Sequence, residues 1–253
     1  MKRIYYNDKG FQLGNLLYLL LKAHSDRRKN IDSYVLRTGY YKFAGIFFPK
    51  TSELFSKANR LVIEQPGYFQ ISNKDFSSED LDSFCKTYLL NEVEEQSKVF
   101  ENKNITIAIR RTDFLAESRV KAYWYNSIKY IEDTLNIIKG KEKNNFDNLS
   151  IRITSDDPEW CETILSEHLK NNFNLNNITV EKQDIKNNFL QLFSCDKYFI
   201  CPNSTYAYWV GYLLRLSKPE VKTFVPDFNT TLIENGKQIA DTRNWNIIKV
   251  EHF

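Results

Sequence analysis

The second half of the sequence alternates between short apolar runs and segments with helical spacing, and this alternation restricts the fold more than any other feature. From Ala122 to Ile138, apolar side chains recur at helical intervals. Strands that alternate with helices form a parallel sheet with helices on both faces. The sequence therefore predicts an α/β fold. The predicted strands are 105–109, 150–154, 178–180, 198–201 and 221–225, the helices are 122–138, 158–169, 189–193 and 205–216, and a polar loop is predicted at 140–148.

The first hundred residues are less regular. The patterns predict strands at 4–6, 33–36 and 60–64, a leucine-rich helix at 13–24 and a long amphipathic helix from residue 78 to about residue 99. A polar stretch at 101–104 indicates a domain boundary. We expect two Rossmann-like domains, 1–102 and 103–253, and leave open whether the C-terminal tail packs back on the first domain.

Composition and charge exclude several functional classes. The 253 residues include 35 Lys and Arg against 32 Asp and Glu, a net charge of +3, which argues against a nucleic-acid-binding protein. The longest apolar run, 16–21, ends at Lys22. A membrane-spanning helix needs about 20 apolar residues, so none is predicted. The N-terminus lacks the apolar core of a signal peptide, and we expect a cytoplasmic protein.

The usual metal and nucleotide motifs are missing. The four cysteines contain no CxxC pair, which favours buried, reduced thiols in an intracellular protein. The three histidines are scattered, and His24 is interpreted as a helix-end residue. Neither GxGxxG nor GxxxxGK[ST] occurs, and Asp80-Leu81-Asp82 is interpreted as a solvated helix face rather than a metal-binding DxD motif.

Three polar clusters each directly follow a predicted strand. They are Arg110-Arg111-Thr112-Asp113, Ser155-Asp156-Asp157 and Asn203-Ser204-Thr205. In an open α/β sheet, ligands bind outside the carboxyl ends of the strands. Adjacent arginines need an anionic partner, and a helix N-terminus with two hydroxyls suits a phosphate. Together the clusters predict a crevice for a diphosphate.

More ordinary interpretations of these clusters remain open at this stage. Arg110 and Arg111 could serve only to form salt bridges with Asp113 or Asp156. Asp156 and Asp157 could likewise be simple helix caps.

Taken in order, the motifs resemble bacterial glycosyltransferase family 11, the α-1,2-fucosyltransferases, and more distantly the α-1,6- and protein O-fucosyltransferases. The family's H-x-R-R-x-D motif is similar to residues 108–113, its S-D-D-x-x-W motif to residues 155–160, and its N-S-[ST]-[FY]-[SA]-x-W motif to residues 203–209. Weaker similarities lie at 11–16, 123–128 and 241–245. The sequence departs from these patterns at Ala108, where the motif has histidine, and at Phe11, Gln12 and Leu16.

The resemblance implies a GT-B-like fold: two Rossmann-like domains with parallel sheets and a cleft between them. It implies a metal-independent enzyme with no cofactor, which transfers fucose from GDP-fucose with inversion to a sugar hydroxyl. Arg110 would bind the β-phosphate, with help from Arg111. The other residues implied in donor binding are Asp156 and Asp157 at the guanine or ribose, Asn203, Ser204 and Thr205 at the phosphates, and Gly14 and Asn15 from the other domain.

An inverting transferase also needs a base for the acceptor hydroxyl. Asp113 and Glu117 are the main candidates and Asp8 is a third, although Asp113 could instead orient an arginine. The expected acceptor is a galactoside of a surface glycan such as O-antigen, with a lipid-linked acceptor and peripheral contact with the inner membrane as further options. Two alternatives stay open: a transferase of the same fold that uses another nucleotide sugar, and a non-catalytic relative that binds nucleotides or glycans.

Overall fold

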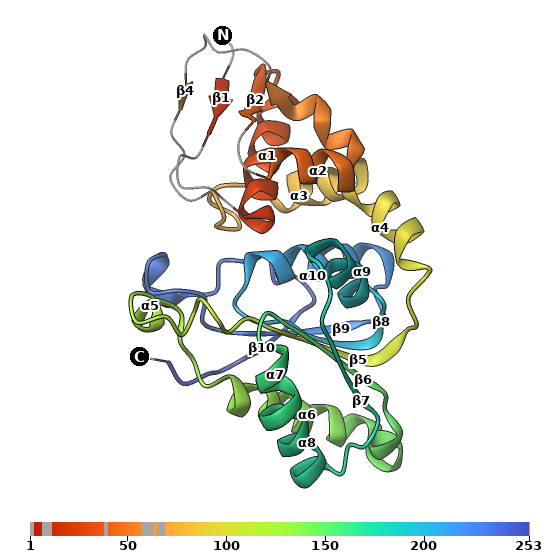
Figure 1. Cartoon of the computed structure of the whole chain (residues 1–253). Helices are drawn as coiled ribbons and strands as arrows, with labels where there is room; N and C mark the ends of the chain where they lie inside the picture. Colours follow the sequence, from red (N-terminus) through yellow and green to blue (C-terminus); the bar gives the residue numbers. More distant parts are fainter. Residues whose placement is uncertain (1–2, 7–11, 38–39, 57–62, 65–68, 253) are drawn as a thin grey trace. The chain divides into compact units, whose positions relative to one another are not determined.

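The computed structural model describes residues 3–6, 12–37, 40–56, 63–64 and 69–252, and the chain folds into two compact units (Figure 1). The N-terminal unit comprises Met1–Gln96 and Ile239–Asp241, and the C-terminal unit comprises Ser97–Gln238 and Thr242–Phe253. The units divide just before the polar stretch at 101–104. A short piece of the tail belongs to the N-terminal unit, while the rest stays with the C-terminal unit.

The N-terminal unit is built on a four-stranded parallel sheet in the order β3-β2-β1-β4. The leucine-rich helix α1 connects β1 to β2, and its leucines are buried on nearly all sides, as expected for a helix that is apolar all round. The elements are β1 (Arg3–Tyr5), α1 (Leu13–Arg28), β2 (Ser33–Leu36), α2 (Tyr41–Phe47), a 3₁₀ helix (Pro49–Leu54), β3 (Phe55–Ser56), β4 (Ile63–Glu64), α3 (Ser78–Phe84), a π-helical turn (Cys85–Leu89) and α4 (Leu90–Ser97).

The long helix predicted from residue 78 is confirmed as the continuous run of α3, the π-helical turn and α4. Its start is fixed by Ser77, whose hydroxyl accepts a hydrogen bond from the Asp80 N–H. Of the strand predicted at 60–64, the structure describes Ile63–Glu64 as β4, and residues 60–62 lie outside the described residues.

One interpretation of this region is wrong. Asp80 does not lie on a solvated face, because it is 6% exposed. Its carboxylate accepts hydrogen bonds from Ser25 at 2.6 Å and from Arg28 at 2.6 Å, both on α1. Burial by itself raises the pKa of Asp80, but the Ser25 hydrogen bond and the Arg28 charge hold that pKa below its usual value.

The C-terminal unit holds a six-stranded parallel sheet in the order β10-β9-β8-β5-β6-β7. Helices α6 and α8 cover one face, and α9 and α10 cover the other (Figure 1). The elements are β5 (Lys103–Ile109), α5 (Val120–Tyr123), α6 (Ser127–Glu142), a 3₁₀ helix (Lys143–Asn148), β6 (Ile151–Ser155), α7 (Pro158–Trp160), a π-helical turn (Cys161–Leu165), α8 (Ser166–Phe173), β7 (Ile178–Glu181), α9 (Ile185–Phe193), β8 (Cys195–Ile200), α10 (Thr205–Ser217), β9 (Lys222–Pro226), a 3₁₀ turn (Glu234–Gly236) and β10 (Asn246–Ile248).

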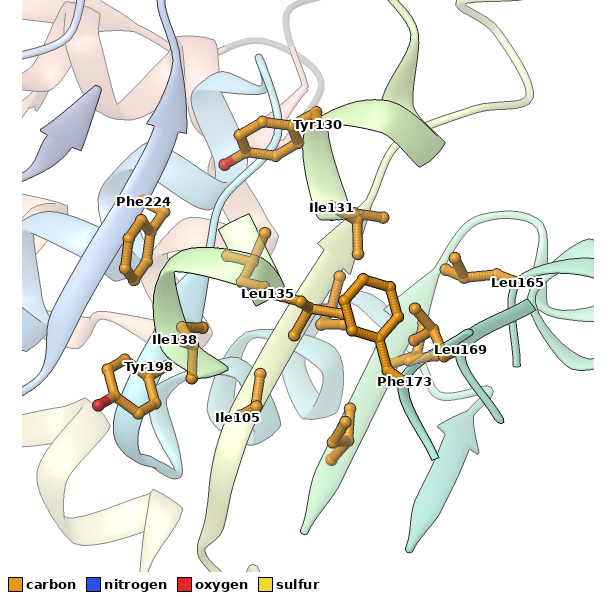
Figure 2. Packing of buried hydrophobic residues seen from close by; sticks show 14 of the residues in the cluster. Ile105, Tyr130, Ile131, Leu135, Ile138, Leu165, Leu169, Phe173, Tyr198 and Phe224 are labelled. Atoms are coloured by element: carbon orange, nitrogen blue, oxygen red, sulfur yellow. The ribbon is translucent and has the colours of Figure 1, made fainter. Parts of the chain in front are cut away.

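Alternate residues of β5 build the core on the α6 face of this sheet. Ile105, Ile107 and Ile109 pack in one cluster with Leu135 of α6 and Leu169 of α8 (Figure 2). Because successive strand residues point to opposite faces, Thr106 and Ala108 belong to the other face. The central strand is therefore buried on both sides, and the predicted α/β architecture with parallel sheets is confirmed.

Two local predictions for this unit are wrong. The helix predicted over 122–138 is interrupted between α5 and α6, because the Asn126 side chain caps α6 by accepting a hydrogen bond from the Lys129 N–H. The polar loop predicted at 140–148 is helical instead, since α6 continues to Glu142 and the following 3₁₀ helix buries Phe146 completely.

The sheet order brings the three predicted clusters to one edge. Strand β5 lies between β6 and β8, and each of the three strands has one of the polar clusters at or within three residues of its C-terminal end. No helix among the described residues is long and apolar enough to cross a membrane. All four cysteines are buried with free thiols, and burial raises the pKa of Cys195 to about 11.

Candidate functional site

The turn after β5 is held by a carboxylate from the neighbouring strand. Asp156 follows β6, and its Oδ1 accepts a hydrogen bond from the Arg111 N–H at 2.8 Å. Its Oδ2 accepts hydrogen bonds from the Thr112 N–H at 3.3 Å and from the Thr112 hydroxyl at 2.6 Å. Asp156 thus has partners inside the chain, and its predicted contact with guanine or ribose stays a prediction.

Arg110 lies between two carboxylates. Its Nε is 2.8 Å from Oδ1 of Asp113 and 3.4 Å from Oδ2 of Asp156. The contact with Asp113 is an ion pair rather than an aligned hydrogen bond, because that Oδ1 accepts no hydrogen bond from a described residue. Arg119 pairs with the other oxygen of Asp113 at 3.0 Å. Both oxygens of Asp113 therefore face arginines, as expected for a carboxylate that orients them.

Arg111 is held by different groups. Its Nε donates to Oδ2 of Asp157 at 3.0 Å, and its guanidinium lies 4.1 Å from the centre of the Trp160 ring. Asp157 also caps α7, since its Oδ1 accepts a hydrogen bond from the Trp160 N–H at 3.3 Å. The helix-cap interpretation of Asp157 is therefore correct, and the same carboxylate holds an arginine.

The third cluster begins α10. Asn203 is 3% exposed, and its amide nitrogen donates to the carbonyl oxygens of Tyr123 at 3.1 Å and Asn229 at 2.7 Å. Asn203 therefore links three segments of the chain: its own, the end of α5 at Tyr123 and the loop after β9 at Asn229. Ser204 precedes the helix, and within the described residues its hydroxyl does not cap the N–H groups of the first turn. Ser204 and Thr205 thus begin a helix N-terminus of the kind that binds anions.

The electrostatics link this helix to the turn after β5. Burial raises the pKa of Tyr206, in the first turn of α10, well above its usual value, and the charge of Asp184 raises it further. The charge of Arg110 acts in the opposite direction and lowers the Tyr206 pKa. The first and third clusters also follow neighbouring strands of the sheet, β5 and β8.

The remaining predicted residues have simpler surroundings. Glu117 is exposed on the segment between β5 and α5. In the N-terminal unit, Gly14 is buried in the first turn of α1, and the Asn15 side-chain oxygen accepts a hydrogen bond from Gln70 at 3.0 Å. Asp8, the third candidate base, lies outside the described residues.

Some residues of the site gave no recognisable signal in the sequence. Arg119 is one, because nothing in its spacing pairs it with Asp113. The stacked rings of Phe114 and Tyr123, 4.6 Å apart, are another, and they tie the segment after the arginines to α5. Tyr123 lay within a motif of the resemblance, but its stacking partner could not be inferred from the sequence alone.

A cluster of metal ligands or a cavity elsewhere in the described residues would be a competing candidate site. No group of three or more His, Cys, Asp or Glu side chains in that part of the chain is arranged to hold a metal ion. A cavity of about 650 Å³ lies in the N-terminal unit, where Lys22, Arg28, Lys74 and Asp80 contribute to its lining. None of the predicted site residues lines it.

Comparison with known proteins gives one family match. The model of glycosyl transferase family 11 matches residues 19–249 of the chain. No curated protein matches the sequence.

Three solved glycosyltransferase structures are similar at low identity. E. coli heptosyltransferase WaaC with ADP matches at 10% identity and a TM-score of 0.49, covering 98% of this chain and 93% of that chain. Glycosyl transferase family 9 from Veillonella parvula DSM 2008 matches at 9% identity and a TM-score of 0.43, covering 98% of this chain and 85% of that chain. POFUT1 in complex with GDP matches at 11% identity and a TM-score of 0.38, covering 88% of this chain and 74% of that chain. Similarities this low carry no information on ligand or activity.

Proposed function

The chain belongs to glycosyl transferase family 11 and is a glycosyltransferase, and on that premise we propose that it transfers L-fucose from GDP-fucose to a glycan hydroxyl. The observation that carries the proposal is the meeting of Arg110, Arg111 and the start of α10 at one edge of the C-terminal sheet. The sugar and the guanine base come from the motif resemblance.

In the proposed reaction, the acceptor oxygen attacks the anomeric carbon of fucose from the face opposite the diphosphate. The new bond joins the anomeric carbon to the acceptor oxygen, and the bond from that carbon to the β-phosphate oxygen breaks. The electron pair leaves with GDP, so negative charge grows on the diphosphate in the transition state. Fixed positive groups at that position lower the barrier.

Arg110 is the residue best placed for this charge. The Nε atom of its guanidinium faces Asp113 and Asp156. The outer Nη edge is the part of a guanidinium that grips phosphate with two parallel hydrogen bonds. The N-terminus of α10, with Ser204 and Thr205, supplies N–H groups and hydroxyls for other phosphate oxygens. Arg111 adds a second positive charge beside the first.

The acceptor proton must pass to a base. Asp113 suits this task poorly, because Arg110 and Arg119 face its two oxygens. Glu117 lies four residues further along the chain, and its side chain is exposed to solvent. We therefore assign Glu117 as the base and Asp113 as the residue that orients Arg110.

We also propose a galactoside of a surface glycan such as O-antigen as the acceptor, an α-1,2 linkage, and a cytoplasmic enzyme in peripheral contact with the inner membrane. These assignments rest on the motif resemblance. The donor-site residues require no metal ion in this scheme, since arginines and a helix N-terminus neutralise the diphosphate.

A ligand panel tests the donor assignment. Thermal stability is measured without divalent metal in the presence of GDP, GDP-fucose, GDP-mannose, UDP, UDP-sugars and CMP-sialic acid. A ligand at 100 times its Kd adds about 2.7 kcal/mol to the free energy of unfolding. We expect shifts with GDP and GDP-fucose that disappear in Arg110→Ala. The matched control Arg215→Ala, in the last turn of α10, should keep them.

Other outcomes distinguish the alternatives. Shifts with UDP or CMP compounds alone would retain the transferase and reject fucose as the sugar. Binding of GDP with neither fucosyl transfer to galactosides nor hydrolysis of GDP-fucose would indicate a non-catalytic relative.

A further inference from the structure

We propose that Asp156 is a positioning residue, which shapes the turn after β5 so that Arg110 meets the diphosphate, and that it does not contact the nucleotide. The inference rests on the proposed function, in which Arg110 binds the diphosphate. It assigns Asp156 a different role from the contact with guanine or ribose that the motif resemblance implies.

The carboxylate of Asp156 is almost fully used inside the chain. It accepts three hydrogen bonds, from the Arg111 N–H at 2.8 Å, the Thr112 N–H at 3.3 Å and the Thr112 hydroxyl at 2.6 Å. A carboxylate offers about four acceptor positions. The ion pair with Arg110 at 3.4 Å occupies the remaining side. Little capacity is left for a ribose hydroxyl or a guanine N–H.

These contacts fix the backbone next to Arg110. Two successive N–H groups, at residues 111 and 112, donate to one carboxylate, and these hydrogen bonds restrict the backbone conformation of the turn after β5. The same carboxylate and Asp113 hold the Arg110 Nε atom. Asp156 therefore fixes the backbone that follows Arg110, and it shares the Nε atom of the Arg110 side chain with Asp113.

Asp156 is itself rigidly placed. The residue before it, Ser155, pairs with Ile109 in the parallel register of β6 and β5. The residue after it, Asp157, donates its N–H to the Ser155 hydroxyl at 2.9 Å and caps α7. Asp156 thus lies between the end of β6 and the start of α7, and these two elements fix the position of the carboxylate that contacts Arg110.

The two neighbouring aspartates provide a matched comparison. Asp156 holds Arg110 and the turn, whereas Asp157 holds the Arg111 side chain. If Asp156 acts through Arg110, its removal should matter only while Arg110 is present. If it contacts the nucleotide directly, its removal should matter in either background.

A double-mutant cycle on ligand affinity separates these cases. GDP binding is measured by calorimetry for the wild-type chain, Asp156→Asn, Arg110→Ala and the double variant. We expect each single change to weaken binding by about 10-fold or more, because each loses a charge-assisted contact. In the Arg110→Ala background, Asp156→Asn should change the affinity by less than about 2-fold. Equal effects in both backgrounds would overturn the proposal.

Two further variants calibrate the cycle. Asp157→Asn should keep its own effect in the Arg110→Ala background, because its partner is Arg111. Asp133 lies on α6 and pairs with Lys129. The Asp133→Asn change should leave the GDP affinity unchanged in both the wild-type and the Arg110→Ala backgrounds.

A gentler variant guards against misfolding of Asp156→Asn. Thr112→Val removes one hydrogen bond to Asp156 at an exposed position, and it should show a smaller effect with the same dependence on Arg110. Hydrogen exchange of the Arg111 and Thr112 amides should quicken in Asp156→Asn while the amides of β5 stay protected. Unchanged exchange at these two amides would also contradict the proposal.

A failure of the proposed function gives a different result. If the wild type does not bind GDP, the donor assignment fails, and the same cycle is measured with inorganic pyrophosphate, which shares the diphosphate chemistry. If the wild type binds neither GDP nor pyrophosphate, the positioning role falls as well.

Discussion

Gly211 lies in the middle of α10 because Trp245 occupies the space that a side chain would need. A Cβ atom at residue 211 would lie 2.5 Å from Cζ2 and 2.9 Å from Cη2 of the Trp245 indole. The indole stacks on Tyr212 with ring centres 5.3 Å apart. Trp245 belongs to the closing motif of the chain, and α10 begins with another motif. The glycine therefore lets the two motif segments pack together.

The first prediction concerns this contact. Gly211→Ala should destabilise the protein by about 1–3 kcal/mol, since the rigid indole must move. The matched control is Gly140→Ala on α6, where a Cβ atom would meet nothing within 4 Å. That change should be neutral or stabilising by up to about 1 kcal/mol. Urea unfolding measures both, and equal stabilities for the two variants would contradict the packing argument.

Asn203 gives a second prediction at this scale. Its amide nitrogen bridges the carbonyl oxygens of Tyr123 and Asn229 in a buried position. Asn203→Ala leaves these acceptors without a donor and should cost about 1–3 kcal/mol of stability. Asn203→Asp should cost more, because a buried carboxylate would face two carbonyl oxygens. Thermal unfolding of both variants checks this order, and a stable Asn203→Asp protein would contradict it.

The proposed base yields a third prediction. Glu117→Gln should lower kcat for fucosyl transfer by about 100-fold, in the range of general base catalysis. Its affinity for GDP should stay within about 2-fold of wild type, because GDP is the leaving group and not the acceptor. Glu220→Gln, an exposed carboxylate between α10 and β9, is the control. An unchanged kcat in Glu117→Gln would remove Glu117 from the mechanism.

At the scale of elements, α1 and α3 are joined by polar groups at a buried face. His24 of α1 is 8% exposed and shares a hydrogen bond with the Ser83 hydroxyl of α3 at 3.0 Å. Burial lowers the pKa of His24 below 6.5, and the charge of Arg28 lowers it further. The interpretation of His24 as a helix-end residue is therefore wrong, because α1 continues to Arg28 and packs the ring against α3.

This shift predicts a pH dependence of stability. Below pH 6.5 the unfolded chain protonates His24 more readily than the folded chain does. Protons then favour the unfolded state, so stability falls as the pH decreases from 6.5 toward the lowered folded pKa. We expect His24→Gln to lose less stability than wild type between pH 7 and pH 5 in urea unfolding. Parallel losses would show that His24 does not contribute.

The elements that the sequence predicted are those with a strong apolar pattern. The buried β5 and the leucine-rich α1 were predicted because their apolar residues leave few alternatives. The sequence gives weaker signals for short elements at sheet edges, such as β3 (Phe55–Ser56) and β10 (Asn246–Ile248). These strands form through tertiary pairing, with β2 and β9 respectively, rather than through their own composition.

The site could be predicted in position but not in its contacts. Polar clusters after parallel strands meet at one sheet edge, so the grouping of Arg110 with Asp156 followed from the topology. Which carboxylate holds which arginine did not, because hydrogen-bond partners depend on side-chain geometry that the sequence does not encode locally. The misinterpretation of Asp80 has the same cause, since Ser25 and Arg28, which bind it, lie more than 50 residues earlier in the sequence.

At the scale of the whole molecule, the residues proposed to bind the diphosphate all belong to the C-terminal unit. This unit supplies the two arginines, the carboxylates that hold them and the start of α10. The N-terminal unit contributes Gly14 and Asn15 to the motif pattern and holds a separate cavity. Substitutions in the C-terminal unit of the intact chain therefore test the proposed donor binding.

Calorimetric titration of the intact chain with GDP in the presence of EDTA tests the central proposal most directly. We predict that wild type binds GDP without metal, that Arg110→Ala binds it at least about 10-fold more weakly, and that Arg215→Ala binds it like wild type. Tight GDP binding by Arg110→Ala, or no binding by wild type, would contradict the proposed donor site.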